Sequence, residues 1–91
     1  MLEKKILITA ETGMHSRPAT ILVTEADKFK SSIMLLAHDK TIDFKSIIGV
    51  LSLGIYMGET ITLTFAGEDE EAASEKIIGL IEELHIGKEV K

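Results

Sequence analysis

The sequence predicts an α+β fold, an open-faced two-layer sandwich in which helices cover one face of an antiparallel sheet. Strand-like and helix-like segments follow the order β-α-β-β-α-β-α, one strand alternates polar and apolar residues, and two helices are amphipathic. The chain has 91 residues, of which 45% are hydrophobic, enough for one core. With no linker or internal repeat, we expect a single domain, residues 1–91.

The first half of the chain contains three strand-like segments and one helix-like segment. Lys5–Thr9 is short and rich in β-branched residues, which predicts a strand that ends in a turn at Thr12-Gly13. Apolar residues recur at helical spacing from about His15 to Lys28, which predicts an amphipathic helix. Ser32–Ala37 and Thr41–Phe44 then predict a hairpin.

The second half begins with a short helix, which Ser46 caps at its N-terminus and Gly54 closes. Glu59–Phe65 alternates polar and apolar residues and predicts a strand with one buried face. The acidic run Glu68–Glu71 leads into a last amphipathic helix, which places these acids at the positive end of its dipole. We expect Gly87 to end that helix.

Composition excludes several classes of protein. Ten Lys and Arg against 15 Asp and Glu give 10 − 15 = −5, which argues against direct binding of nucleic acid. The absence of Cys excludes disulfides and thiolate metal sites. No stretch fits a signal peptide or a membrane span. We therefore expect a cytoplasmic protein without membrane insertion.

The chemistry-bearing residues gather in Gly13–Thr20, where the chain's one Arg and one Pro, Arg17 and Pro18, follow His15 closely. Pro is favoured in a first helical turn, and the unpaired N–H groups there attract anions. A neutral imidazole is a nucleophile near pH 7, and a guanidinium offers paired donors to phosphate. The segment fits a phosphohistidine relay, with His15 as acceptor and Arg17 stabilising the phosphate.

Other interpretations of this segment remain open on chemistry alone. His15 would then cap a helix, and Arg17 would be a solvated cation. His38 and His85 lie far from His15 in sequence and lack the spacing of metal ligands, so we expect solvated histidines and neither a metal nor a cofactor. No nucleophile-elbow motif indicates a hydrolase.

Lys45–Leu53 forms a second candidate site. A phosphate on Ser46 would be stabilised at a helix N-terminus and would act as a switch. The short helix has more apolar residues than one contact buries, so we expect Ile47, Ile48 and Leu51 to form an exposed patch that binds partners. A capped and fully buried helix is the alternative.

Together the two segments resemble HPr, the phosphocarrier family of the phosphoenolpyruvate-dependent sugar phosphotransferase system. Gly13–Thr20 is similar to the phosphohistidine motif of that family, and Lys45–Ile55 is similar to its regulatory-serine segment. The resemblance covers nearly the whole chain. It implies a four-stranded antiparallel sheet with three helices on one side.

The resemblance also implies roles for individual residues. His15 would accept the phosphoryl group through Nδ1, and Arg17 would bind the phosphate. Ser46 would be the regulatory serine, and Ile47, Ile48 and Leu51 would dock partners.

The implied function is that of a carrier rather than an enzyme. It would accept a phosphoryl group from enzyme I, originally from phosphoenolpyruvate, and pass it to enzyme IIA for sugar uptake. Further implied partners are an HPr kinase/phosphorylase acting on Ser46 and a transcription factor of carbon catabolite control. We expect a monomer that presents one face to several partners.

Two other functions remain alternatives. One is a regulatory binding module in which His15 is incidental, although regulatory paralogues replace that histidine with a residue that cannot be phosphorylated. The other is a carrier in a nitrogen-type relay, which would use the same residues.

This sequence departs from the family pattern at a few positions. Ser16 stands where alanine is usual, and Thr12 stands where serine is frequent. We expect Thr12, Ser16 and Pro18 to lie beside the phosphate at the helix N-terminus. The tail from His85 to Lys91 matches no part of the pattern.

Overall fold

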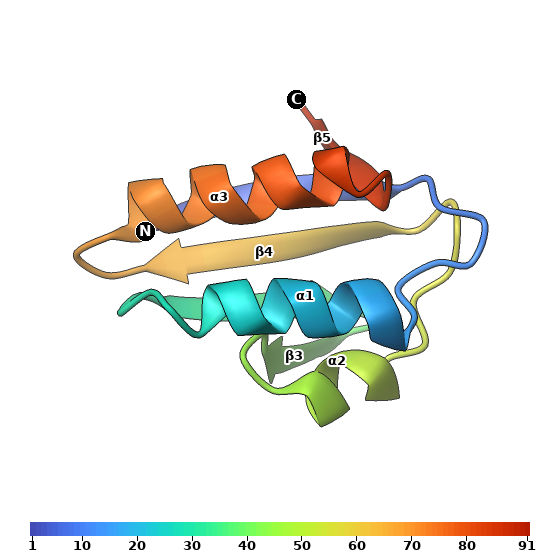
Figure 1. The fold of residues 1–91 in the computed structure, drawn as a ribbon, viewed down its shortest axis with the longest axis horizontal. Coiled ribbons are helices and arrows are strands. Elements are labelled where there is room, and N and C mark those ends of the chain that lie inside the picture. The colour runs from blue at the N-terminus through green and yellow to red at the C-terminus, as the bar shows by residue number, and fades with distance from the viewer.

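The computed structural model describes all residues, 1–91, and contains five strands and three helices (Figure 1). In chain order the elements are β1 (Leu2–Ile8), α1 (Ser16–Ala26), β2 (Ser32–Ala37), β3 (Lys40–Asp43), α2 (Ile47–Ser52), β4 (Thr60–Ala66), α3 (Glu70–Glu83) and β5 (Gly87–Val90). The predicted order of strands and helices is confirmed up to α3. None of the helices is long and apolar enough to cross a membrane.

The five strands form one antiparallel sheet in the order β3-β2-β4-β1-β5. The central strand β4 pairs with β1, where Ile6 lies opposite Ile61, and with β2, where Leu35 lies opposite Leu63. Figure 1 shows α1 and α3 side by side over one face of this sheet, with α2 beyond α1. The predicted open-faced sandwich is therefore confirmed.

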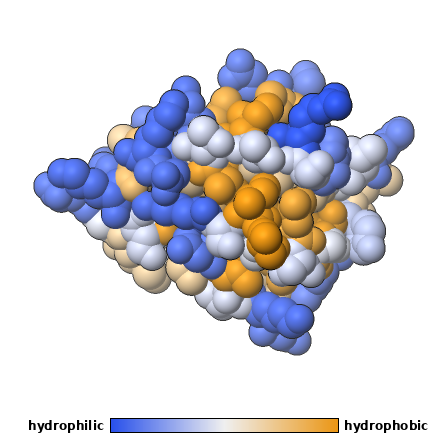
Figure 2. Space-filling model, turned by 60° about the horizontal axis from the view of Figure 1, so that its bottom comes forward, coloured by the Kyte–Doolittle hydropathy of each residue, from blue (hydrophilic) through white to orange (hydrophobic).

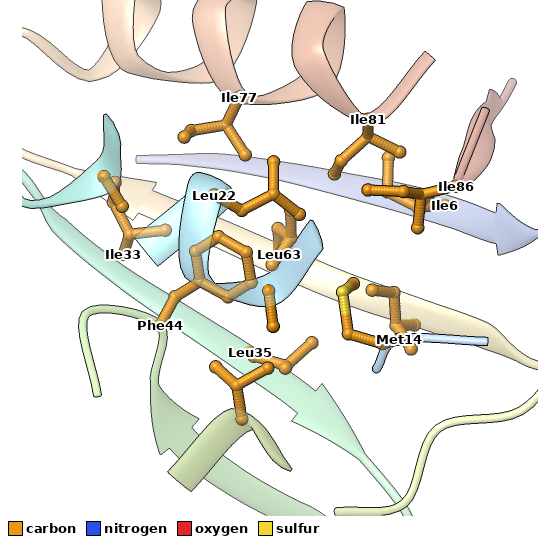
Figure 3. Packing of buried hydrophobic residues seen from close by; sticks show 14 of the residues in the cluster. Ile6, Met14, Leu22, Ile33, Leu35, Phe44, Leu63, Ile77, Ile81 and Ile86 are labelled. Carbon is orange, nitrogen blue, oxygen red and sulfur yellow. The ribbon is translucent and has the colours of Figure 1, made fainter. Parts of the chain in front are cut away.

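The core lies between the helices and this face of the sheet. In β4 the apolar residues of the alternating pattern are buried, as predicted: Ile61, Leu63 and Phe65 are inaccessible to solvent, while their neighbours are partly or fully exposed. Leu22 of α1 and Ile77 and Ile81 of α3 point toward the sheet and meet these side chains (Figure 3). Burial of the alternate positions fixes the register of the sheet, because a one-residue slip would turn this apolar row to water.

The hairpin between β2 and β3 turns at His38 and Asp39, whose φ angles are +54° and +61°. Two consecutive residues with positive φ are typical of the two-residue turn that matches the twist of paired strands. β3 therefore begins at Lys40, inside the expected turn, and ends at Asp43, one residue earlier than expected. Phe44 leaves the strand but stays fully buried, and its N–H donates to the carbonyl of Ile33 at 2.8 Å.

The prediction for the end of the last helix is wrong. α3 ends at Glu83, and the residue in the left-handed conformation after it is His85, with φ of +58°, rather than Gly87. The N–H of Ile86 donates to the carbonyl of Ile81 at 2.9 Å, which closes the helix end. The chain is thereby turned back toward the sheet two residues earlier than expected.

Gly87 instead begins β5, a fifth strand beyond the four that the resemblance implied. β5 pairs with β1, with Ile8 opposite Gly87 and Lys5 opposite Val90. The tail that fitted no pattern in the sequence is therefore part of the sheet.

The start of α3 is tied to the start of β2 by Asp69. Its carboxylate accepts hydrogen bonds from the N–H groups of Lys30 and Ser31, both at 2.9 Å, and from the hydroxyl of Ser31. The bond from the Ser31 hydroxyl, followed by that from the Lys30 N–H, holds the pKa of Asp69 below its ordinary value. Glu70 and Glu71 lie in the first helical turn, as the acidic run predicted.

Candidate functional site

His15 lies at the residue that precedes the first turn of α1. Its backbone is extended, with φ of −91° and ψ of −179°, and its carbonyl accepts the N–H of Ala19 at 3.1 Å. The imidazole makes no capping hydrogen bond to the helix and is exposed to solvent. His15 therefore occupies the N-cap position of α1, as the capping interpretation expects, but its ring makes no cap hydrogen bond and stays accessible to a partner.

The residues after His15 form an anion-attracting helix end. Ser16 and Arg17 occupy the first turn of α1, where N–H groups have no acceptor within the helix, and Pro18 has no N–H to leave unpaired. Ser16 is held through its carbonyl, which accepts the hydroxyl of Thr20 at 2.7 Å. Arg17 is exposed and takes part in none of the ion pairs of the protein, so its guanidinium is available to an anion.

A shallow depression of about 290 Å³ surrounds this helix end. It is lined by polar and turn residues of the predicted site and by apolar residues from elsewhere in the chain: Ala10, Thr12, Gly13, His15, Arg17, Pro18, Ile21, Leu84 and Ile86. The structure thus brings Thr12, His15, Arg17 and Pro18 together, whereas Ser16 lies outside the lining. Leu84 and Ile86 were missed because only the turn after α3 brings them here, and nothing in their local sequence signals it.

The loop before His15 is fixed by two backbone hydrogen bonds. Gly13 donates to the carbonyl of Ala10 at 2.9 Å, and Met14 donates to the carbonyl of Ile55 at 3.1 Å. Gly13 has φ of +64°, and a Cβ at this position would lie 2.2 Å from the oxygen of Ile55. Only glycine fits such an approach. The side chain of Met14 enters the core (Figure 3). His15 therefore follows a well-anchored residue.

Ser46 is the N-cap of α2, as predicted. Its hydroxyl oxygen accepts the N–H of Gly49 at 3.2 Å, and the residue is exposed. The preceding Lys45 is held in place, because its ammonium group donates to the carbonyl of Phe29 at 2.7 Å and its N–H donates to Asp43 at 2.9 Å. The hydroxyl of Ser46 is thus accessible at a rigid helix start.

The apolar surface near α2 differs in one residue from the expectation. Ile48 is 78% exposed and Leu51 is 38% exposed, whereas Ile47 is only partly exposed and packs against the core. The loop after α2 adds Tyr56 and Met57, at 69% and 56% exposure, which sequence reasoning missed. Figure 2 shows apolar surface gathered in a patch, with polar side chains around it, on the side of the molecule that carries α2.

Glu59, at the end of the same loop, pairs with a histidine of the turn between β2 and β3. His38 is not simply solvated: its Nε2 lies 2.9 Å from a carboxylate oxygen of Glu59, whose other oxygen accepts the N–H of Tyr56 at 3.0 Å. The bond to His38, and then that to Tyr56, keeps the pKa of Glu59 below its ordinary value. No cluster of three or more His, Cys, Asp or Glu side chains is arranged to hold a metal ion.

An open-faced sandwich with a histidine at a helix N-terminus is the arrangement found here. Comparison with known protein families shows which class of protein has it. Residues 2–83 match the family described as the PTS HPr component phosphorylation site. The chain belongs to the HPr family of the phosphotransferase system.

Relatives with both HPr and Crh names are similar to the chain. The HPr-like protein Crh of Halalkalibacterium halodurans is 43% identical over 82 residues, which are 90% of this chain and 98% of that protein. The histidine-containing phosphocarrier protein of a Mycoplasma has a TM-score of 0.92 at 32% identity, covering 94% of this chain and 98% of its own. The catabolite repression protein Crh of Bacillus subtilis, described as a dimer with a swapping domain, has a TM-score of 0.71 at 37% identity over 91% of this chain and 95% of its own.

Proposed function

We propose that this protein is a phosphoryl carrier of the sugar phosphotransferase system. His15 accepts the phosphoryl group from the phosphohistidine of enzyme I, originally drawn from phosphoenolpyruvate, and passes it to enzyme IIA. The protein is a substrate of both partners and not itself an enzyme. The free, exposed imidazole of His15 in the depression beside Arg17 is the observation that carries this proposal.

The chemistry at His15 is an exchange of one N–P bond for another. The unprotonated Nδ1 attacks phosphorus, a new N–P bond forms, and the N–P bond of the donor breaks, so its imidazole leaves with the bonding electron pair. Each transfer moves one phosphoryl group and needs no water, metal or redox partner. Arg17 and the free N–H groups at the start of α1 favour the negative charge on the phosphoryl oxygens.

Partners dock on the surface that joins the two candidate sites. Ile48 and Leu51, together with the exposed loop residues Tyr56 and Met57, supply apolar contact area. A phosphate on Ser46 adds about −1.5 to −2 charge beside this area and repels acidic surfaces of enzyme I. We therefore propose that an HPr kinase/phosphorylase acts on Ser46, and that the phosphorylated form serves a catabolite control transcription factor.

A regulatory module without phosphoryl transfer at His15 is the second candidate. It is favoured by the 43% identity to the HPr-like protein Crh of Halalkalibacterium halodurans and the 37% identity to that of Bacillus subtilis. Such paralogues, as the resemblance implies, have no histidine that can be phosphorylated, whereas this chain has His15 in an accessible position. A carrier role therefore accounts for more of its residues.

The experiment is phosphoryl uptake from phosphoenolpyruvate and a bacterial enzyme I, followed by intact mass and by lability in acid. We expect one acid-labile phosphate on the parent protein and none on His15→Ala. His85→Asn is the matched control, because it removes another exposed imidazole and asparagine tolerates the positive φ of that position.

Enzyme I and enzyme IIA are then combined to test onward transfer. If well-folded parent protein takes up no phosphate while a known HPr does so in the same mixture, the carrier function is wrong. Acid-stable phosphate on Ser46 after incubation with a kinase and ATP would then support the regulatory module.

A further inference from the structure

One peptide unit joins the loop before His15 to the loop after α2, where the two loops lie side by side (Figure 1). The C=O of this unit belongs to Ile55 and accepts the N–H of Met14 at 3.1 Å. The N–H of the same unit belongs to Tyr56 and donates to Oε2 of Glu59 at 3.0 Å. Because a peptide unit is planar and rigid, its C=O and N–H cannot turn independently. Glu59 and the segment that bears His15 therefore hold opposite ends of one rigid group.

Glu59 is itself held in place from two directions. Its other carboxylate oxygen, Oε1, lies 2.9 Å from Nε2 of His38 in the turn between β2 and β3. Its backbone carbonyl accepts the N–H of Ile8 at 2.9 Å, at the end of β1. The bond to His38, followed by that from Tyr56, keeps the pKa of Glu59 below its ordinary value, so the carboxylate is ionised at neutral pH. The hydrogen bond from Tyr56 is therefore charge-assisted and stronger than one to a neutral acceptor.

Little else fixes the orientation of this peptide unit. The side chain of Tyr56 is 69% exposed, so it does not anchor the loop. Gly58 follows with φ of +91°, and a Cβ there would meet nothing within 4 Å, so packing does not confine the backbone at this point. The buried side chain of Ile55 fixes where the chain passes. The tilt of the unit after it depends on the two hydrogen bonds that the unit makes.

This tilt matters at the reacting histidine because Met14 directly precedes His15. The bond from Met14 to Ile55 is one of two backbone bonds that fix the loop. Without its acceptor, the N–H of Tyr56 would turn toward water, and the carbonyl of Ile55 would turn with it. Phosphoryl transfer needs the attacking atom in line with the leaving group, and a small misplacement slows such a step. The loss of one hydrogen bond corresponds to a change of about 3- to 10-fold.

We propose that Glu59 is a positioning residue for His15. Its carboxylate holds the peptide unit between Ile55 and Tyr56 in the orientation that anchors Met14, and this sets the place of the His15 ring during phosphoryl transfer. Glu59 is not among the residues that line the depression at His15, so it acts through the two loops and is not a catalytic residue. The inference rests on the proposed carrier function, because it assigns a role within that transfer.

Three variants test this role. Glu59→Ala removes the acceptor for the N–H of Tyr56, whereas the amide oxygen in Glu59→Gln can still accept it. Glu75→Ala is the matched control, since it removes an exposed carboxylate on α3. The side chain of Glu59 is 30% exposed, so we expect all three variants to fold, which circular dichroism and urea unfolding check.

The first measurement is amide hydrogen exchange of the unphosphorylated proteins. In Glu59→Ala the amides of Tyr56 and Met14 should exchange about 3- to 10-fold faster than in the parent. Both amides should exchange at the parental rate in Glu59→Gln and Glu75→Ala. This measurement does not depend on phosphoryl transfer, so it reports on the junction alone.

The second measurement is transfer from phosphorylated enzyme I over a range of carrier concentrations, which separates kcat from KM. For Glu59→Ala, kcat should fall by about 3- to 10-fold while KM is unchanged, because docking is intact and the attacking ring is misplaced. Glu59→Gln should restore kcat, and Glu75→Ala should match the parent. A lost docking contact would instead raise KM.

The proposal is overturned if Glu59→Ala keeps the parental kcat, if only its KM changes, or if kcat falls while the amide of Met14 keeps its parental exchange. It is also overturned if Glu59→Gln is as slow as Glu59→Ala, because the lost acceptor would then not be the cause. Failure of Glu59→Ala to fold would make Glu59 a structural residue. These results refute the inference alone, whereas a folded parent that takes up no phosphate beside an active HPr refutes the carrier function and the inference with it.

Discussion

The N–H of Met14 donates a hydrogen bond to the carbonyl oxygen of Ile55 at 3.1 Å, and this bond joins the loop before His15 to the loop after α2. The same oxygen lies where a Cβ on Gly13 would have to be. The segment that presents His15 and the segment that follows Ser46 are therefore locked together by backbone contacts.

Gly13→Ala should destabilise the protein by about 2 kcal/mol or more, because it combines a positive φ with a clash against backbone. Urea unfolding followed by circular dichroism measures the loss. Gly79→Ala, in the open middle of α3, should instead raise the free energy of unfolding by about 0.5–1 kcal/mol. Equal stability of parent and Gly13→Ala would mean that the junction is more pliable than its contacts indicate.

Arg17→Ala should slow phosphoryl transfer to His15 by roughly 100-fold, the usual effect of removing one donor to a developing charge. Arg17 is exposed, so the fold should be unaffected. The rate is measured by rapid quench with phosphorylated enzyme I. Lys28→Ala is the control, since it removes a cation that is 63% exposed just after the C-terminal end of α1. An unchanged rate in Arg17→Ala would remove the role assigned to the guanidinium.

Ser46→Asp should slow transfer from enzyme I while leaving stability unchanged, because aspartate caps a helix as well as serine does but adds a negative charge. Ser46→Asn keeps the cap without the charge and should transfer at the parental rate. A third variant, Ser46→Ala, loses the bond to Gly49 and should be about 1 kcal/mol less stable. Parental kinetics in Ser46→Asp would exclude a charge switch at this position.

Ile48→Ser should weaken docking without harming the fold. The side chain is 78% exposed, and exposed substitutions of this kind change stability by about 0.5 kcal/mol or less. We expect a higher KM of enzyme I for this carrier with kcat unchanged, because the contact is made equally before and during transfer. If KM stays at the parental value, partners do not use the apolar patch at α2.

Asp69 should contribute stability that depends on pH. Its pKa is lower in the folded than in the unfolded protein because the carboxylate accepts bonds from Ser31 and Lys30. The contribution is therefore complete above the unfolded value of about 3.9 and is lost as the pH falls through the depressed folded value. Asp69→Asn should be less stable than the parent at pH 7, and the difference should shrink in acid. Glu68→Gln, which removes a carboxylate at an exposed neighbour, is the control variant.

Local patterns in the sequence were sufficient for most of the fold. The alternation in β4 and the serine before α2 each depend on neighbouring residues, and both predictions are confirmed. β5 could not be predicted in this way, because Gly87–Val90 is short and its strand character comes from pairing with β1. In the sequence, Gly87 has the position of a glycine that ends a helix. Its close contact with the backbone of Leu7, which only the fold shows, accounts for the glycine instead.

The same distinction applies to the candidate site. His15, Arg17 and Pro18 lie close together in one short segment, so their chemistry was visible as a motif, and their roles remain predictions. The wall formed by Leu84 and Ile86 depends on the turn after α3, and burial of Ile47 depends on how α2 packs. Both are tertiary effects, which no spacing within one segment reveals.

Tyr56 gives the molecule a built-in optical probe. The chain has one tyrosine and no tryptophan, so its emission on near-ultraviolet excitation comes from a single side chain. That side chain is 69% exposed. The backbone of Tyr56 lies next to Gly13, since a Cβ built on Gly13 would be 3.0 Å from the Cα of Tyr56. We therefore expect changes at the loop that bears His15 to alter this emission in the native protein, without a dye or an added residue.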